Sequence, residues 1–219
     1  MLSKIKHQKI SGYAGMFGTI QFIIISLAAM PFYGGGTAWN HTAEGYTFWQ
    51  NFLSDLGRTV AYNGVENTVS SPLFNGSMVL FGVTLVLLYS FAFRLFSSSL
   101  GYIITITGIL SGIGMAIIAS APDNLNPDQH MLGVWIWAFA LLGTVVLIIL
   151  QDFRSKEGKK QFMILSIVLA IAVAIHISQG LLDIRGSIIP ATQKVVVYMN
   201  CAWYLLLSQR MILKDSINE

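Results

Sequence analysis

Long apolar stretches separated by polar segments dominate the hydrophobic pattern of the chain. Six of these stretches have, or nearly have, the roughly 20 residues that a helix needs to cross a bilayer. They lie at about 11–32, 73–95, 100–121, 131–150, 161–182 and 191–210. We therefore predict an all-α integral membrane protein in which residues 1–219 form one domain, a bundle of six transmembrane helices.

The composition agrees with a chain that is embedded in lipid. Apolar residues make up 54% of it and charged residues 11%, with a mean hydropathy of +0.65, whereas a soluble domain has roughly 25% charged residues. The net charge of +3 is spread over short clusters between apolar stretches, so we expect no nucleic-acid partner. The expected partners are membrane lipids and a lipid or small-molecule ligand. The single cysteine, Cys201, excludes an internal disulfide.

Lysine and arginine are distributed unevenly between alternate connections. If the N-terminus is cytoplasmic, ten of the 13 basic residues lie on the cytoplasmic side, and the other side keeps Arg58, Arg185 and Lys194. Short cytoplasmic loops of membrane proteins carry such an excess of positive charge. We predict a multi-pass protein of the cell membrane with the N-terminus and the C-terminus both cytoplasmic.

The connection between the first two apolar stretches is about 40 residues long and contains the polar segment NFLSDLGR, residues 51–58. Thr47 and Gln50 have the spacing of a capping box, and Gly57 suits the position after a helix end. Apolar residues recur on one helical face at Trp49, Phe52, Leu53 and Leu56. This pattern predicts a short interfacial helix over residues 48–56, within a long extracytoplasmic loop.

Polar side chains gather near the extracytoplasmic ends of the predicted spans. Ionisable residues within a span are rare and usually face the bundle interior or a functional site. His176 lies about two turns below the outer end of its stretch, and the turn APDNLNPDQH leads into the span at 131–150. The candidate catalytic residues are therefore Ser54, Asp55, Asp123, His130 and His176. The candidate ligand-binding residues are Asn75, Gln179, Asp183, Gln193, Asn200 and Tyr204.

This arrangement predicts a polar cavity that opens to the extracytoplasmic side, and it leaves two functions open. The first is the binding, sensing or transport of a lipid or small molecule; the apolar cytoplasmic half gives transport little support. The alternative is an integral-membrane hydrolase or lipid-modifying enzyme with its site at the outer leaflet. There His130 and His176 would act as acid-base groups or as ligands of a metal ion such as zinc, oriented by an aspartate.

The segment at 51–58 is expected to form a wall of that cavity. A buried imidazole needs a polar partner. We therefore expect Asp55 or Asp123 to lie close to one of the two histidines, either directly or through water.

Three segments carry a resemblance to a known family: FLSDLGR, SPLFNGSMVLFG and APDNLNPDQHMLG. They resemble the six-span membrane family catalogued as domain of unknown function 998. The Ser54–Gly57 element is also similar to one in the damage-regulated autophagy modulator family, which includes a GPI-anchor lipid-remodelling factor. The resemblance covers nearly the whole chain and implies a six-helix membrane fold, with no catalytic residues to carry over.

A looser similarity connects the chain to seven-span membrane hydrolases that include the alkaline ceramidases. Those enzymes hold zinc with three histidines, a serine and an aspartate. This chain departs from the pattern, because six spans are predicted and it has no His-x-x-x-His pair. Its histidines on the outer side are His41, His130 and His176.

Overall fold

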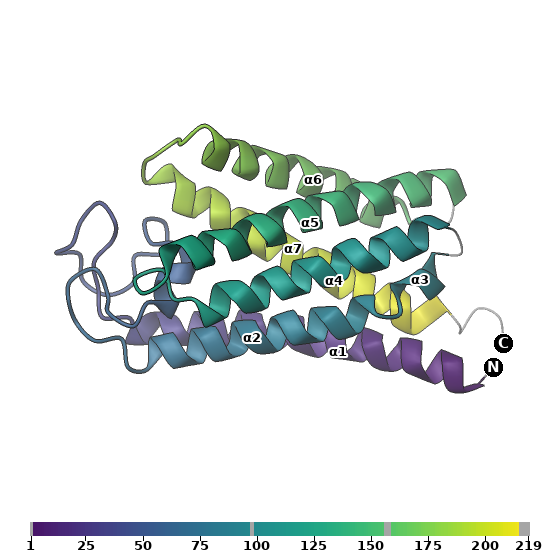
Figure 1. The fold of residues 1–219 in the computed structure, drawn as a ribbon, viewed down its shortest axis with the longest axis horizontal. Coiled ribbons are helices and arrows are strands. Elements are labelled where there is room, and N and C mark those ends of the chain that lie inside the picture. Colours follow the sequence, from purple (N-terminus) through teal and green to yellow (C-terminus); the bar gives the residue numbers. More distant parts are fainter. Residues whose placement is uncertain (1, 97–98, 156–158, 215–219) are drawn as a thin grey trace.

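The computed structural model describes residues 2–96, 99–155 and 159–214 (Figure 1). Within these residues the chain is helical and contains no β-strand. The long helices are α1 (Leu2–Ala29), α2 (Ser70–Tyr89), α4 (Ser99–Ser120), α5 (Pro127–Ser155), α6 (Lys160–Leu181) and α7 (Ile188–Leu213). The short ones are α3 (Ala92–Leu95) and two 3-10 helices, η1 (Met30–Phe32) and η2 (Leu53–Gly57).

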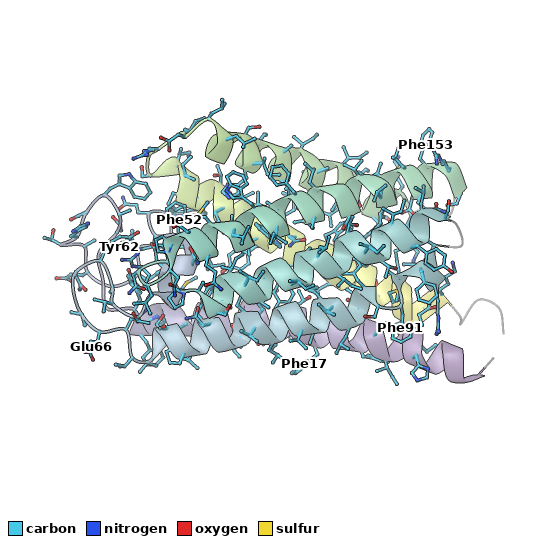
Figure 2. All side chains as sticks on the ribbon, in the orientation of Figure 1. Phe17, Phe52, Tyr62, Glu66, Phe91 and Phe153 are labelled. Carbon is cyan, nitrogen blue, oxygen red and sulfur yellow. The ribbon has the colours of Figure 1, made fainter. Side chains whose placement is uncertain are left out.

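Five segments of the described chain are helical, long and apolar enough to cross a membrane. They are His7–Phe32, Ser70–Leu95, Ser99–Ser120, Pro127–Ser155 and Lys160–Leu181. Large apolar side chains such as Phe17 and Phe153 are exposed on the outside of the helices (Figure 2), as expected of a surface in contact with lipid. These features indicate a membrane protein and agree with the predicted all-helical bundle.

Helix α7 is not among these five segments, and several of its polar side chains are buried within the protein. Lys194, Asn200 and Ser208 are almost completely buried. Side chains of α7 also reach across the bundle, where the Tyr204 ring packs edge-on against Phe81 of α2. Since this helix faces protein over much of its surface, it needs fewer apolar residues than a helix surrounded by lipid.

The long helices pack side by side in chain order, and α7 closes the arrangement by packing against both α6 and α1 (Figure 1). Helix α1 begins and α7 ends at the same end of the bundle, which we call the terminal end. Residues 30–69 lie at the opposite end, which we call the loop end (Figure 1).

Small residues allow α4 to approach its neighbours closely. A Cβ atom on Gly82 of α2 would lie 2.6 Å from the carbonyl oxygen of Gly112 in α4, and one on Gly114 would lie 2.6 Å from the backbone nitrogen of Trp137 in α5. Close backbone approach of this kind is a main source of helix association in lipid. Helix α4 is therefore the packing helix that its glycines indicate.

A partly buried ion pair joins α5 to α7 near the terminal end. The guanidinium of Arg210 donates two hydrogen bonds to the Asp152 carboxylate, at 2.7 and 2.9 Å. Its central carbon also lies 4.7 Å from the ring centroid of Phe162. Bidentate geometry offsets much of the cost of removing both charges from water.

The helix predicted over residues 48–56 is wrong in its extent, because the chain forms a turn and then the shorter helix η2. The backbone N–H of Thr47 donates to the side-chain oxygen of Asn51 at 2.8 Å, and Phe52 is extended. An asparagine side chain that binds local backbone competes with helix formation. The predicted apolar face is divided accordingly, since Leu53 is buried and Trp49 is 60% exposed.

Candidate functional site

The end of η2 is fixed to the start of α2 by hydrogen bonds to its carbonyl groups. The Gly57 carbonyl accepts hydrogen bonds from the Ser71 hydroxyl and the Asn75 amide, both at 2.9 Å, and the Leu56 carbonyl accepts one from Ser70 at 3.1 Å. The last carbonyls of a helix need such external partners. Asn75, expected to bind a ligand, is thus engaged in holding the loop.

The start of η2 is fixed to α7 by two side chains. The side-chain oxygen of Gln193 accepts a hydrogen bond from the backbone N–H of Leu53 at 2.7 Å. The ammonium of Lys194 donates to the Asn51 carbonyl, and it lies 5.5 Å from the ring centroid of Tyr46. Lys194 is 1% exposed, so these contacts replace the water that its charge has lost.

The Asp55 carboxylate is turned into the loop. One of its oxygens accepts hydrogen bonds from the Asn51 side chain and the Phe52 backbone N–H, both at 2.9 Å. Burial raises the pKa of Asp55 from 3.8 to about 6, although these hydrogen bonds and the nearby Arg58 act in the opposite direction. Asp55 therefore organises the segment that carries Ser54.

Asp123 is also bound to the loop. Its carboxylate forms an ion pair with Arg58 at 2.8 Å, and its neighbour Asn124 donates a hydrogen bond to the hydroxyl of Thr59 at 2.8 Å. The expectation that Asp55 or Asp123 pairs directly with a histidine is thus not met among the described residues. Each carboxylate is instead satisfied by groups of the loop.

A cavity of about 40 Å³ lies where η2 meets the bundle. Every long helix and η2 contribute side chains to it. The lining residues are Phe22, Leu53, Ser54, Phe74, Met78, Met115, Ile118, His130, Val134, Trp137, His176, Gln193 and Val197. Four of the predicted site residues, Ser54, His130, His176 and Gln193, are therefore brought together from four different elements.

His130 is held in a defined orientation at the start of α5. Its Nδ1 lies 2.9 Å from the carbonyl oxygen of Ala121. A carbonyl can only accept a hydrogen bond, so Nδ1 must carry the proton. In the neutral ring Nε2 then has a free lone pair, which suits it to accept a hydrogen bond, take up a proton or bind a metal ion.

Two further lining residues each have a buried ring nitrogen without a hydrogen-bond partner. These atoms are Nδ1 of His176 in α6 and Nε1 of Trp137 in α5. A buried polar atom without a partner costs about 1–3 kcal/mol. A molecule or ion in the cavity would provide a binding partner for these nitrogen atoms.

The other predicted ligand-binding residues lie outside the set that lines the cavity. Gln179 joins α6 to α7 by a hydrogen bond with Thr192 at 2.9 Å. Asp183 pairs with Arg185 in an exposed turn. Asn200 and Tyr204 are fully buried deeper in the bundle. Residues that were grouped because they share a helical face therefore lie in different environments: a helix–helix contact, an exposed turn and the buried core.

The described residues contain no group of three or more histidine, cysteine, aspartate or glutamate side chains that could hold a metal ion. Zinc sites in proteins are built from these residue types, usually three or four of them. A zinc site formed by His130 and His176 therefore has no third ligand of this kind among them.

In comparisons with known proteins, the chain matches no protein-family model, no curated protein and no solved structure. The family resemblances seen in the sequence therefore stay predictions.

The raised pKa of Asp55 predicts a pH dependence of stability. Because its folded-state pKa is above 3.8, the folded protein favours the protonated carboxyl. The resulting stabilisation is complete below about pH 4 and is lost as the pH rises through about 6. It amounts to on the order of 3 kcal/mol of the free energy of unfolding. We expect Asp55→Asn to flatten the profile of apparent unfolding temperature, measured in detergent from pH 4 to pH 7.

The exposed carboxylate of Asp183 is the control for this experiment. Asp183→Asn should leave the wild-type pH profile unchanged. A wild-type unfolding temperature that rises between pH 4 and pH 6, relative to Asp55→Asn, would contradict the assignment.

Proposed function

We propose that the chain crosses the membrane six times, with α7 as the sixth span and both termini cytoplasmic. Helix α7 has 26 residues, about 39 Å at 1.5 Å per residue, and so is long enough to cross. Support for an even number of crossings comes from α1 beginning and α7 ending at the terminal end (Figure 1). The excess of lysine and arginine at that end supports its cytoplasmic location.

Cysteine labelling of intact cells tests this topology. The native Cys201 is completely buried, so it should not react. Cysteine introduced at the exposed loop residue Thr68 should react with a membrane-impermeant maleimide, and cysteine at the exposed Lys160 should react only after permeabilisation. The reverse pattern would invert the proposed orientation.

We propose further that this protein binds a lipid or small molecule through a polar group that enters the cavity at the loop end. The observation that carries the proposal is the convergence of Ser54, His130, His176 and Gln193 on one cavity. Its volume of about 40 Å³ compares with roughly 300–1,000 Å³ for pockets that enclose a drug-sized ligand. The cavity therefore suits a small part of a ligand, or a ligand of very few atoms.

Photo-crosslinking tests ligand entry. Protein in phosphatidylethanolamine nanodiscs is irradiated with a phosphatidylethanolamine that carries a diazirine beside its ester group. We expect crosslinks to peptides containing Val134 and Val197. Val197→Phe, which fills the cavity, should reduce them about tenfold, a loss of about 1.4 kcal/mol of binding free energy.

Val195→Phe is the matched control, because Val195 belongs to the same helix and is exposed. This variant should crosslink at the wild-type level. Crosslinks that map solely to outward-facing side chains, or that Val197→Phe leaves unchanged, would count against a lipid in the cavity.

A hydrolase is the second candidate function. The observation in its favour is that the Ser54 hydroxyl and the His130 imidazole, with its free Nε2, line the same cavity. A serine nucleophile needs such a base within hydrogen-bond reach, and the base is usually oriented by a third group. Here the Ala121 carbonyl orients His130, whereas Asp55 and Asp123 are engaged in the loop.

A fluorophosphonate probe, which reacts covalently with activated serines, tests this alternative. If the protein is a serine hydrolase, the probe should label wild type and Ser178→Ala but not Ser54→Ala. Equal labelling of Ser54→Ala, or none of the wild-type protein, would exclude a serine mechanism at this site.

A further inference from the structure

We propose that the cavity at the loop end binds a soft monovalent metal ion, Cu(I), through the imidazoles of His130 and His176 and the thioethers of Met78 and Met115. The inference rests on one part of the proposed function, that a ligand enters this cavity, and it assigns a metal ion there in place of the polar group of a lipid. The four side chains come from four different helices, α5, α6, α2 and α4, and all line the one cavity.

The chemistry of the available donor atoms selects the metal. Thioether sulfur is a soft ligand that favours Cu(I), and imidazole nitrogen binds copper as well. The described lining residues contribute no carboxylate and no thiolate. Hard ions such as Mg²⁺ and Ca²⁺ take about six or more oxygen ligands, many of them carboxylates, whereas the side chains of the described lining offer oxygens at Ser54 and Gln193 alone. Zinc lacks a third histidine, cysteine or carboxylate.

The cost of burying charge also favours a monovalent ion over a divalent one. All four proposed ligands can bind as neutral groups, so the charge of the ion is not cancelled by its ligands. The Born cost of burying an ion grows with the square of its charge, so a divalent ion costs about four times as much as a monovalent ion of equal size.

The two histidines are prepared for coordination in different ways. Nδ1 of His130 donates to the Ala121 carbonyl, and a metal-binding histidine characteristically donates its other ring N–H to a carbonyl or carboxylate. Nδ1 of His176 is buried without a partner. Binding of a metal ion would satisfy a nitrogen atom that otherwise makes no hydrogen bond.

The two methionines proposed as ligands are buried side chains. Met78 is 6% exposed and Met115 is 2% exposed. Methionine is unbranched and has three rotatable side-chain bonds, so its sulfur can shift toward an ion without movement of the helix. A cavity of about 40 Å³ has ample room for one ion.

Metal titration of the purified full-length chain in detergent tests the proposal. Cu(I), kept reduced under anaerobic conditions, is titrated against a competing chelator, and Ag(I), which does not change oxidation state, is measured by native mass spectrometry. We expect one ion per chain. X-ray absorption should detect both sulfur and nitrogen in the first coordination shell.

The double variant Met78→Leu/Met115→Leu should lower the Cu(I) and Ag(I) affinity by at least about 100-fold. Exchange of methionine for leucine conserves volume and costs less than about 1.5 kcal/mol per site, so the variant should fold. Met131→Leu and Met199→Leu are matched controls, because these methionines lie outside the described lining. Both should bind as wild type does.

Wild-type protein that binds no Ag(I), or a double variant that binds it with wild-type affinity, overturns the metal assignment. Preferential binding of Zn²⁺ also overturns it. The proposed function is judged separately by photo-crosslinking. Loss of lipid crosslinks in Val197→Phe, together with no Ag(I) binding, would refute the metal alone.

Discussion

The attachment of the long loop to helix α7 is the constraint on which the candidate site depends. Asn51, fully buried, is at its centre: its side chain binds the Gly36 carbonyl and the Asp55 carboxylate, each within 2.9 Å, and its own carbonyl accepts a hydrogen bond from Lys194. An ammonium placed this deep requires partners, since an unpaired buried charge is very costly. The loop therefore stabilises the lysine, and the lysine fixes the loop.

Once that attachment is made, the position of the cavity follows. The hydrogen bond from the Leu53 backbone to Gln193 places η2 against α7, and the next residue, Ser54, lines the same cavity as residues of α5 and α6. Below it, the close approach of α2 and α4 at Gly82 and Gly112 brings methionines of both helices to the same point. Helices that pack through small residues have little freedom to shift, so the donor atoms lie in a rigid framework.

The sequence could predict the helices because lipid imposes a length and an apolar composition on each span. It could also predict four residues of the cavity, because polar groups near such spans stand out from the apolar pattern. These residues are Ser54, His130, His176 and Gln193. Met78, Met115 and Trp137 could not be found in that way, since they are indistinguishable from residues of an apolar core. The sequence could not predict the hydrogen-bond and ion-pair partners of the polar residues either. Asp55 and Asp123 were expected near histidines, but the loop supplies Asn51 and Arg58 first, and neither is specified by helical periodicity. Nor does a heptad-like pattern reveal that Asn51 interrupts the helix expected over 48–56.

The distribution of charge narrows the class of ligand. Two cationic side chains lie near the loop end of the bundle. The ammonium of Lys194 is bound to a loop carbonyl, and the guanidinium of Arg58 is paired with Asp123. A phosphate or carboxylate entering the cavity would therefore meet imidazole, amide and hydroxyl groups without a free cation from Lys194 or Arg58. A buried anion in that setting would lose its hydration and gain few interactions that compensate for the loss. A neutral group that accepts and donates hydrogen bonds, or a soft cation bound by lone pairs, loses far less. The site is thus suited to select its ligand by polarisability and hydrogen-bond geometry, and not by attraction between opposite charges.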